Sequence, residues 1–221
     1  MPRDLSLRGN LNFNAAIKLA WAGFLRCGGF TIPNGHGFDP TIHLTCSSVE
    51  FILSIWEPTH VCLTLSSLKM DPFQKGVSIL VARALSNGEA NLTCAVLALQ
   101  HLFINDPQPM ANSPLFVNGT GTPLSQNFFI SLLKHRLASI GLDQSLYSGH
   151  SFRQVAATSA ATVGYSDYEI QLLGCWHSNA YRLYFDVPDA HILHLSSCLH
   201  LAVAPAPVPD PLVLHFAPAL A

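Results

Sequence analysis

Charge is scarce in this sequence. Only 11% of the 221 residues are Asp, Glu, Lys or Arg, and the formal net charge is −2. Proteins whose main work is to grip nucleic acid usually carry a basic excess, because neutralised phosphates release counterions. The charge balance therefore argues against a strong, free-standing nucleic-acid binder. The apolar fraction of 49% excludes a disordered chain and is enough for a sizeable core.

Long apolar runs and closely paired cysteines are also missing. Lys18, Arg26 and many prolines interrupt the chain before any apolar run reaches the roughly 20 residues of a membrane span. The first ten residues lack the apolar core of a secretory signal. Six cysteines occur without a CxxC pair, which is typical of a reduced intracellular compartment. We therefore expect an intracellular protein with no membrane partner.

Hydrophobic periodicity predicts a mostly helical α+β fold with a small antiparallel three-stranded sheet. The expected helices cover 12–27, 92–103, 125–141, 151–163, 166–176 and 189–201, and the expected strands cover 42–53, 60–67 and 76–83. Gly28 and Gly29 are expected to end the first helix, and Ser166 with Glu169 forms a capping-box pattern. We expect one domain over 12–202, an N-terminal extension over 1–11, and an extended or disordered Pro/Ala-rich tail over 203–221.

The stretch "YSGHSFRQVAATSAA" (147–161) places two cationic-capable side chains at the start of a helix rich in small residues. His150 and Arg153 are three positions apart, so they share one face of that helix. The backbone N–H groups of a helix N-terminus attract anions. This pattern favours a phosphate site, although a helix cap and a surface ion pair would explain it equally well.

Three other stretches carry candidate functional side chains. Arg26 lies in "GFLRCGGFT" (23–31), Lys69 in "SSLKMDPFQKG" (66–76), and Trp176 and Tyr184 in "LLGCWHSNAYRLYF" (172–185). Each also has an ordinary structural explanation: a helix-dipole partner for Arg26, a solvated charge for Lys69 and a core position for Tyr184.

Taken in order, these four stretches resemble the tyrosine recombinase, or phage integrase, family, and look closest to its branch from eukaryotic mobile elements. The resemblance covers roughly residues 12–201. It implies that the chain is a catalytic domain which cleaves and rejoins DNA strands. It also implies DNA as the partner, a homo-oligomer on that DNA, a nuclear location, and no metal or other cofactor.

The resemblance assigns a role to each candidate residue. Arg26 and Arg153 would bind the nonbridging oxygens of a DNA phosphodiester, which suits the forked guanidinium group. Tyr184 would be the nucleophile that forms a 3′-phosphotyrosyl link, with Tyr181 as a competing candidate. Lys69 would be the general acid at the 5′-oxygen, and His150 would be the general base or proton relay. Trp176 would pack beneath the phosphate.

Several positions depart from the family pattern. Where the pattern has an acidic residue that would brace Arg26, this chain has Gly29. The other departures are Cys46 and Ser48 in place of basic and acidic residues, Cys175 in place of Arg, and Val155 in place of Gly. With the first helix expected at Asn12, no room is left for an N-terminal DNA-clamping domain. These features support an alternative interpretation, a degenerate DNA-binding remnant without catalytic activity. A third, a protein that keeps only the fold, has no feature in its favour.

The last expected helix carries a set of possible zinc ligands. His191, His194 and Cys198 fall on one face of the last expected helix, a spacing that can hold zinc. His200 lies on the opposite face and no other fourth ligand is evident, so we expect this helix to pack its apolar side and to bind no metal.

Overall fold

The computed structural model describes residues 7–66, 76–86, 89–108 and 110–175. Within those residues the fold has five α-helices: α1 (Leu7–Ala22), α2 (Ala95–Asn105), α3 (Gln126–Ser139), α4 (Ser151–Thr162) and α5 (Asp167–Leu173). The strands are β1 (Val49–Ile52), β2 (His60–Leu65), β3 (Val77–Ala82), β4 (Leu85–Ser86) and β5 (Glu89–Ala90). Three short 3₁₀ turns are η1 (Cys27–Gly29), η2 (Cys46–Ser48) and η3 (Gln144–Leu146). The predicted α+β class is confirmed.

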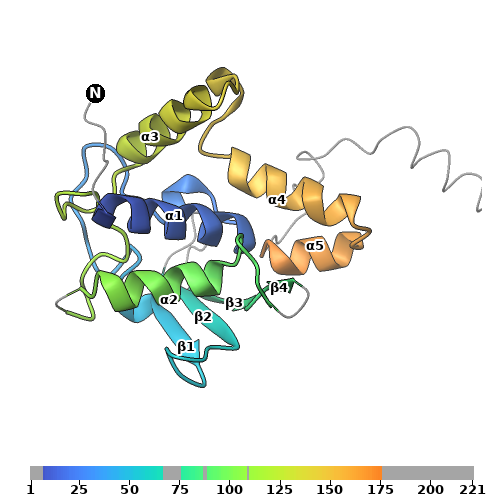
Figure 1. Ribbon diagram of the computed structural model, residues 1–221, viewed down its shortest axis with the longest axis horizontal. Helices are drawn as coiled ribbons and strands as arrows, with labels where there is room; N and C mark the ends of the chain where they lie inside the picture. Colours follow the sequence, from blue (N-terminus) through green and yellow to red (C-terminus); the bar gives the residue numbers. More distant parts are fainter. Residues whose placement is uncertain (1–6, 67–75, 87–88, 109, 176–221) are drawn as a thin grey trace, which may run out of the picture. The chain divides into compact units, whose positions relative to one another are not determined.

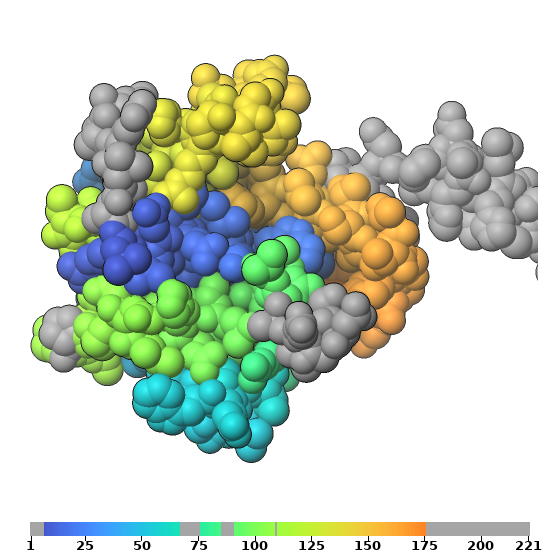
Figure 2. Space-filling model, in the orientation of Figure 1, coloured from blue at the N-terminus to red at the C-terminus, as the bar shows by residue number. Residues whose placement is uncertain are grey.

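Helix α1 is the central element of the described chain. It packs against α2 along one side and against α4 near its C-terminal end. Figure 1 shows α1 between α2 and α3, with the sheet beyond α2. The space-filling view shows the same arrangement, with the blue band of α1 between the yellow of α3 and the green of α2 (Figure 2). No helix in the described ranges is long and apolar enough to cross a membrane.

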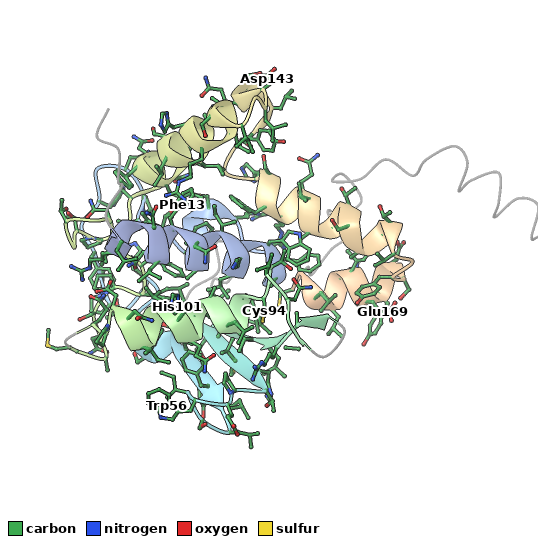
Figure 3. The ribbon with its side chains drawn as sticks, viewed as in Figure 1. Phe13, Trp56, Cys94, His101, Asp143 and Glu169 are labelled. Atoms are coloured by element: carbon green, nitrogen blue, oxygen red, sulfur yellow. The ribbon has the colours of Figure 1, made fainter. Side chains whose placement is uncertain are left out.

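Strands β1, β2 and β3 form an antiparallel meander in sequence order. Val61 pairs with Phe51 on one side and with Val81 on the other, and the alternate residues Val61, Leu63 and Leu65 are buried. This alternation is that of a sheet with one face on the core. The β1–β2 turn carries Trp56, which is largely exposed at its tip (Figure 3).

Aromatic rings fill the core between α1, α3 and α4. The Phe13 and Phe129 ring centroids are 5.3 Å apart, and Figure 3 places Phe13 between α1 and α3. Phe30 meets Phe129 edge to face at 5.0 Å, and Phe152 of α4 lies 5.7 Å from Phe129. The start of α4 is therefore joined through one aromatic cluster to both helices and to the loop after α1.

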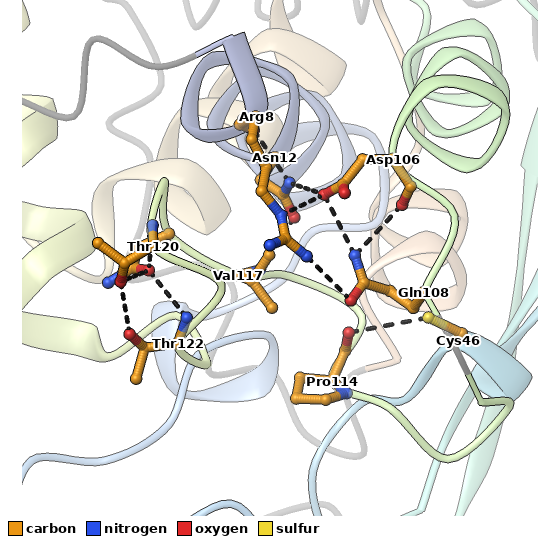
Figure 4. Close-up of polar contacts among 10 residues, drawn as sticks. Arg8, Asn12, Cys46, Asp106, Gln108, Pro114, Val117, Thr120 and Thr122 are labelled. Atoms are coloured by element: carbon orange, nitrogen blue, oxygen red, sulfur yellow. Dashed lines mark hydrogen bonds and ion pairs between the residues drawn. The ribbon is translucent and has the colours of Figure 1, made fainter.

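A buried polar network fixes the N-terminal half of α1. Asn12 accepts a hydrogen bond from the Val117 backbone N–H and donates to the Asp106 carboxylate. Arg8 forms an ion pair with that carboxylate at 2.9 Å, and Gln108 donates to it as well (Figure 4). Asn12 is fully buried, so these bonds satisfy an amide that burial would otherwise make costly.

Several predicted boundaries are confirmed and others are wrong; the second helix, predicted from Leu92, begins at Ala95. Helix α5 begins directly after Ser166, the N-cap of the predicted capping box, and α3 begins after its N-cap Ser125. The first helix was predicted over 12–27, but α1 covers Leu7–Ala22. The first strand was predicted from Ile42 but begins at Val49, because the chain first makes the turn η2.

Candidate active site

Two segments that are far apart in the sequence meet at the predicted phosphate site. One is the loop after α1, and the other is the start of α4. The Cys27 backbone N–H donates to the Gly149 carbonyl at 3.0 Å, and Arg153 Nη1 donates to the Phe24 carbonyl at 3.1 Å. The structure therefore brings the segments of Arg26, His150 and Arg153 together.

The loop after α1 owes its path to an unusual helix end. The Leu25 N–H bonds to the Ala20 carbonyl and the Phe24 N–H to the Trp21 carbonyl, which is the Schellman pattern. Its left-handed position, usually a glycine, is Phe24 with a φ of 52°. The Phe24 ring is buried in a second core cluster with residues of α4 and α5, namely Ala156, Ala157, Ala160 and Ile170. That packing compensates the backbone strain and turns the chain toward α4.

Arg26 follows in extended conformation, with φ −77° and ψ 151°. The prediction that it ends a helix is wrong, because α1 stops at Ala22 and Arg26 instead precedes the turn η1. Its Nε is buried and has no hydrogen-bond partner among the described residues. A buried donor without an acceptor is costly, so this N–H is suited to an anionic ligand.

His150 is the N-cap residue of α4, and its side chain makes no capping hydrogen bond. The adjacent Ser151 hydroxyl instead accepts from the Ser148 N–H at 2.8 Å. His150 is exposed. The His150 side chain is therefore open to a ligand that approaches the start of α4.

Arg153 bridges three parts of the site. Besides the Phe24 carbonyl, it binds the Gly174 carbonyl through Nη2 at 2.7 Å. It thereby connects the loop after α1, helix α4 and the chain that leaves α5. The sequence predicted its proximity to a phosphate but contained no signal for these two backbone acceptors, which lie 129 and 21 residues away.

The remaining predicted residues Lys69, Trp176 and Tyr184 lie outside the described residues, as do Tyr181 and the considered zinc ligands. The described chain does show where their segments begin. Strands β2 and β3 pair from Leu65–Val77 onward, and Lys69 lies in the sequence between them. Trp176 is two residues beyond Gly174, whose carbonyl Arg153 holds.

Three of the departures from the family pattern have a clear structural setting. Gly29 is exposed and has open space around its Cα, so a side chain would fit there. Ser48 caps η2, accepting from the Thr45 N–H. Cys46 lines a cavity of about 130 Å³ beside Asp106, and burial together with that carboxylate raises the pKa of its thiol to about 11. Neither Cys46 nor Ser48 lies in the segments that carry Arg26 and Arg153.

The other cysteines of the site are buried or half-buried thiols. Burial raises the pKa of Cys27 to about 11, although a hydrogen bond with Thr31 opposes the shift. Burial also raises the pKa of Cys175, and the nearby Arg153 charge opposes it. Both thiols therefore stay protonated at neutral pH and act as packing groups. Thr31 and Gly149 also belong to this site, although no pattern in the sequence points to them.

Solved structures of site-specific recombinases share this fold. The XerH recombinase in a post-cleavage complex with its palindromic difH substrate matches 89% of this chain at a TM-score of 0.61 and 14% identity. The XerA recombinase matches 86% of the chain at a TM-score of 0.52 and 15% identity. The chain has the catalytic-domain fold of the tyrosine recombinases.

The recombinase likeness concerns part of each known structure. The chain spans 48% of the length of XerH and 58% of that of XerA. No protein-family model matches the sequence, and no curated protein matches it. The likeness therefore establishes the recombinase fold, and the chemistry has to be argued from the residues.

Proposed function

We propose that the chain cleaves and rejoins DNA strands as a tyrosine recombinase of the eukaryotic mobile-element branch. It would act in the nucleus as a homo-oligomer on DNA. The observation that carries the proposal is that the segments of Arg26 and Arg153 meet within this fold. Two segments more than 120 residues apart are joined by hydrogen bonds at Phe24 and Cys27, on either side of Arg26, and Arg153 itself donates the first of them.

In the proposed reaction, the Tyr184 hydroxyl oxygen attacks the phosphorus of a DNA phosphodiester. A P–O bond to tyrosine forms as the P–O5′ bond breaks, and negative charge grows on the nonbridging oxygens. Arg26 and Arg153 would stabilise that charge with N–H groups held in place before the reaction. Lys69 would give a proton to the leaving 5′-oxygen, and His150 would take the phenol proton. Trp176 would pack beneath the phosphate.

The strand is rejoined by the same chemistry in reverse. A 5′-hydroxyl attacks the phosphotyrosyl bond and releases Tyr184. Because the phosphotyrosyl link retains the bond energy of the phosphodiester, the cycle needs no nucleotide and no metal ion.

The second candidate function is that of a DNA-binding remnant without catalysis. Two observations favour it. Both Nη atoms of Arg153 bind backbone carbonyls, and Gly29 offers no carboxylate to brace Arg26. A remnant would still bind DNA in a salt-sensitive manner, because phosphate contacts do not depend on the nucleophile.

Covalent trapping distinguishes the two functions without knowledge of the target site. The substrate is a pool of short duplexes with randomised sequence and nicks at varied positions, so that cleavage releases a short strand that diffuses away. DNA that survives a denaturing wash on the protein is sequenced. An adduct that is lost in Tyr184→Phe and kept in Tyr181→Phe supports the recombinase.

Two other outcomes have definite meanings. Salt-sensitive DNA binding with no adduct contradicts catalysis and supports the remnant. Absence of DNA binding even at low salt contradicts both functions. The mass of the wild-type complex on a trapped duplex, measured by sedimentation, then tests the proposed homo-oligomer.

A further inference from the structure

The backbones of the two site segments cross most closely at Cys27 and Gly149. Besides the hydrogen bond between them, a Cβ placed on Gly149 would lie 3.1 Å from the Cys27 Cβ. That separation is shorter than an ordinary carbon–carbon contact of about 3.5–4.0 Å. Gly149 does not have a left-handed φ, so its backbone would accept alanine. What this position lacks is space for a side chain.

Cys27 cannot easily retreat from an added methyl group. Its side chain is almost completely buried, and its carbonyl accepts a hydrogen bond from the Thr31 hydroxyl at 2.7 Å. The second neighbour of the added Cβ is the Gln126 Nε2 at 3.4 Å, the end of a flexible amide that can move aside. The displacement therefore falls on the loop after α1.

Arg26 lies between two fixed points of that loop. The loop is held before it at Phe24 and after it at Thr31, through ring packing and hydrogen bonds. Arg26 itself directly precedes Cys27, and its Nε makes no hydrogen bond among the described residues. A shift at Cys27 therefore changes where the Arg26 guanidinium sits before it changes anything else in the site.

We propose that Gly149 is a positioning residue for Arg26: by having no side chain, it lets the Cys27 backbone approach α4 and so sets the guanidinium beside the start of that helix. The placement of Arg26 follows from the contacts alone. Its consequence for DNA cleavage rests on the proposed function.

Chemical modification of Arg26 tests the placement without any DNA. Phenylglyoxal labelling of the intact chain, followed by mass spectrometry of its peptides, gives a rate for each arginine. We expect Gly149→Ala to change the Arg26 rate at least about threefold, while Arg83 and Arg136 keep theirs. Adding Cys27→Gly, which removes the opposing Cβ, should return the Arg26 rate toward the wild-type value.

Gly28→Ala is the matched control, because an added Cβ there has open space around it. It should leave the Arg26 rate unchanged. An unchanged Arg26 rate in folded Gly149→Ala would overturn the inference. So would an equal rise at all three arginines, since that indicates general loosening, or a double variant that labels like Gly149→Ala alone.

The effect on DNA cleavage is measured in a separate experiment. In single-turnover trapping we expect Gly149→Ala to slow adduct formation about 10-fold, because misplacing a catalytic group by a fraction of an ångström is costly. The double variant should recover the rate, and duplex affinity should stay constant in all variants. If wild-type protein forms no adduct, the proposed function fails while the labelling still decides the role of Gly149. Normal cleavage by Gly149→Ala would contradict the inference alone.

Discussion

Arg153 of α4 holds the backbone carbonyl of Phe24 at 3.1 Å, and the same guanidinium holds Gly174 at 2.7 Å. Arg153, which is predicted to bind phosphate, thus also holds two segments of its own site in place. Arg26, its predicted partner, makes no such bond through its buried Nε within the described part of the chain. The two arginines therefore differ in what they contribute to the folded protein.

This difference predicts that two alanine substitutions lower the stability by unequal amounts. Arg153→Ala removes two charge-assisted hydrogen bonds and leaves two carbonyls without their donor, so the free energy of unfolding should fall by about 2–4 kcal/mol. Arg26→Ala should change it by less than about 1 kcal/mol, since no Nε hydrogen bond is lost. Urea unfolding of both variants measures the contrast. Equal losses would contradict the fastening role of Arg153.

Because Phe24 is left-handed, we expect a glycine variant at this position to be more stable than an alanine variant, the reverse of the usual order. Both Phe24→Ala and Phe24→Gly delete the same buried ring. At most positions glycine is then the worse replacement, but here it relieves a φ of 52°. We expect Phe24→Gly to be the more stable of the two by about 1 kcal/mol. Thermal unfolding of the two variants measures this difference in stability. A more stable alanine variant would show that the helix end carries no strain.

Because Gly29 is exposed, the acidic side chain that the family pattern has at this position can be introduced there. A glutamate there has open space, and the Gly29 N–H already bonds to the Arg26 carbonyl at 2.8 Å. Gly29→Glu should raise the trapping rate by about 10-fold by orienting the guanidinium. Gly28→Glu, on the equally open neighbour, is the control for added charge. Similar rates in both variants would contradict a specific brace.

The capping box of α5 predicts a dependence of stability on pH. Hydrogen bonds from the Ser166 hydroxyl and N–H, each 2.7 Å long, hold the pKa of Glu169 below its usual value. A carboxyl group whose pKa is lower in the folded state stabilises the protein above its ordinary pKa, and that stabilisation is lost as the pH falls through the folded-state pKa. Glu169→Ala should therefore be less stable than wild type at pH 7, with the gap closing in acid. A gap that is constant with pH would mean that the cap does not depend on ionisation.

Local signals in the sequence predicted much of this fold. Helix α5 was predicted because Ser166 and Glu169 are three residues apart, and strands β2 and β3 because their buried residues alternate. Such features depend on neighbours in the chain, so a single sequence displays them.

The end of α1 was not predictable in the same way. Gly28 and Gly29 indicate a later stop, whereas the helix ends at Ala22 and is followed by Phe24, which adopts the left-handed conformation usual for glycine. It does so because its ring packs on α4 and α5, which are more than 120 residues away. The same holds for the backbone carbonyls that accept hydrogen bonds from Arg153. It also holds for the close approach of Gly149 to Cys27. They arise only when distant segments meet.

The central claim is that Tyr184 becomes covalently linked to DNA, and one peptide tests it. Trypsin cleaves after Arg182, and because no Lys or Arg follows, the peptide 183–221 contains Tyr184 as its single tyrosine. Tyr181 falls in the preceding peptide, 154–182. After trapping and nuclease trimming, the account predicts a nucleotide remnant on peptide 183–221 by mass spectrometry. A remnant on 154–182, or none on either peptide while DNA binding persists, would contradict it.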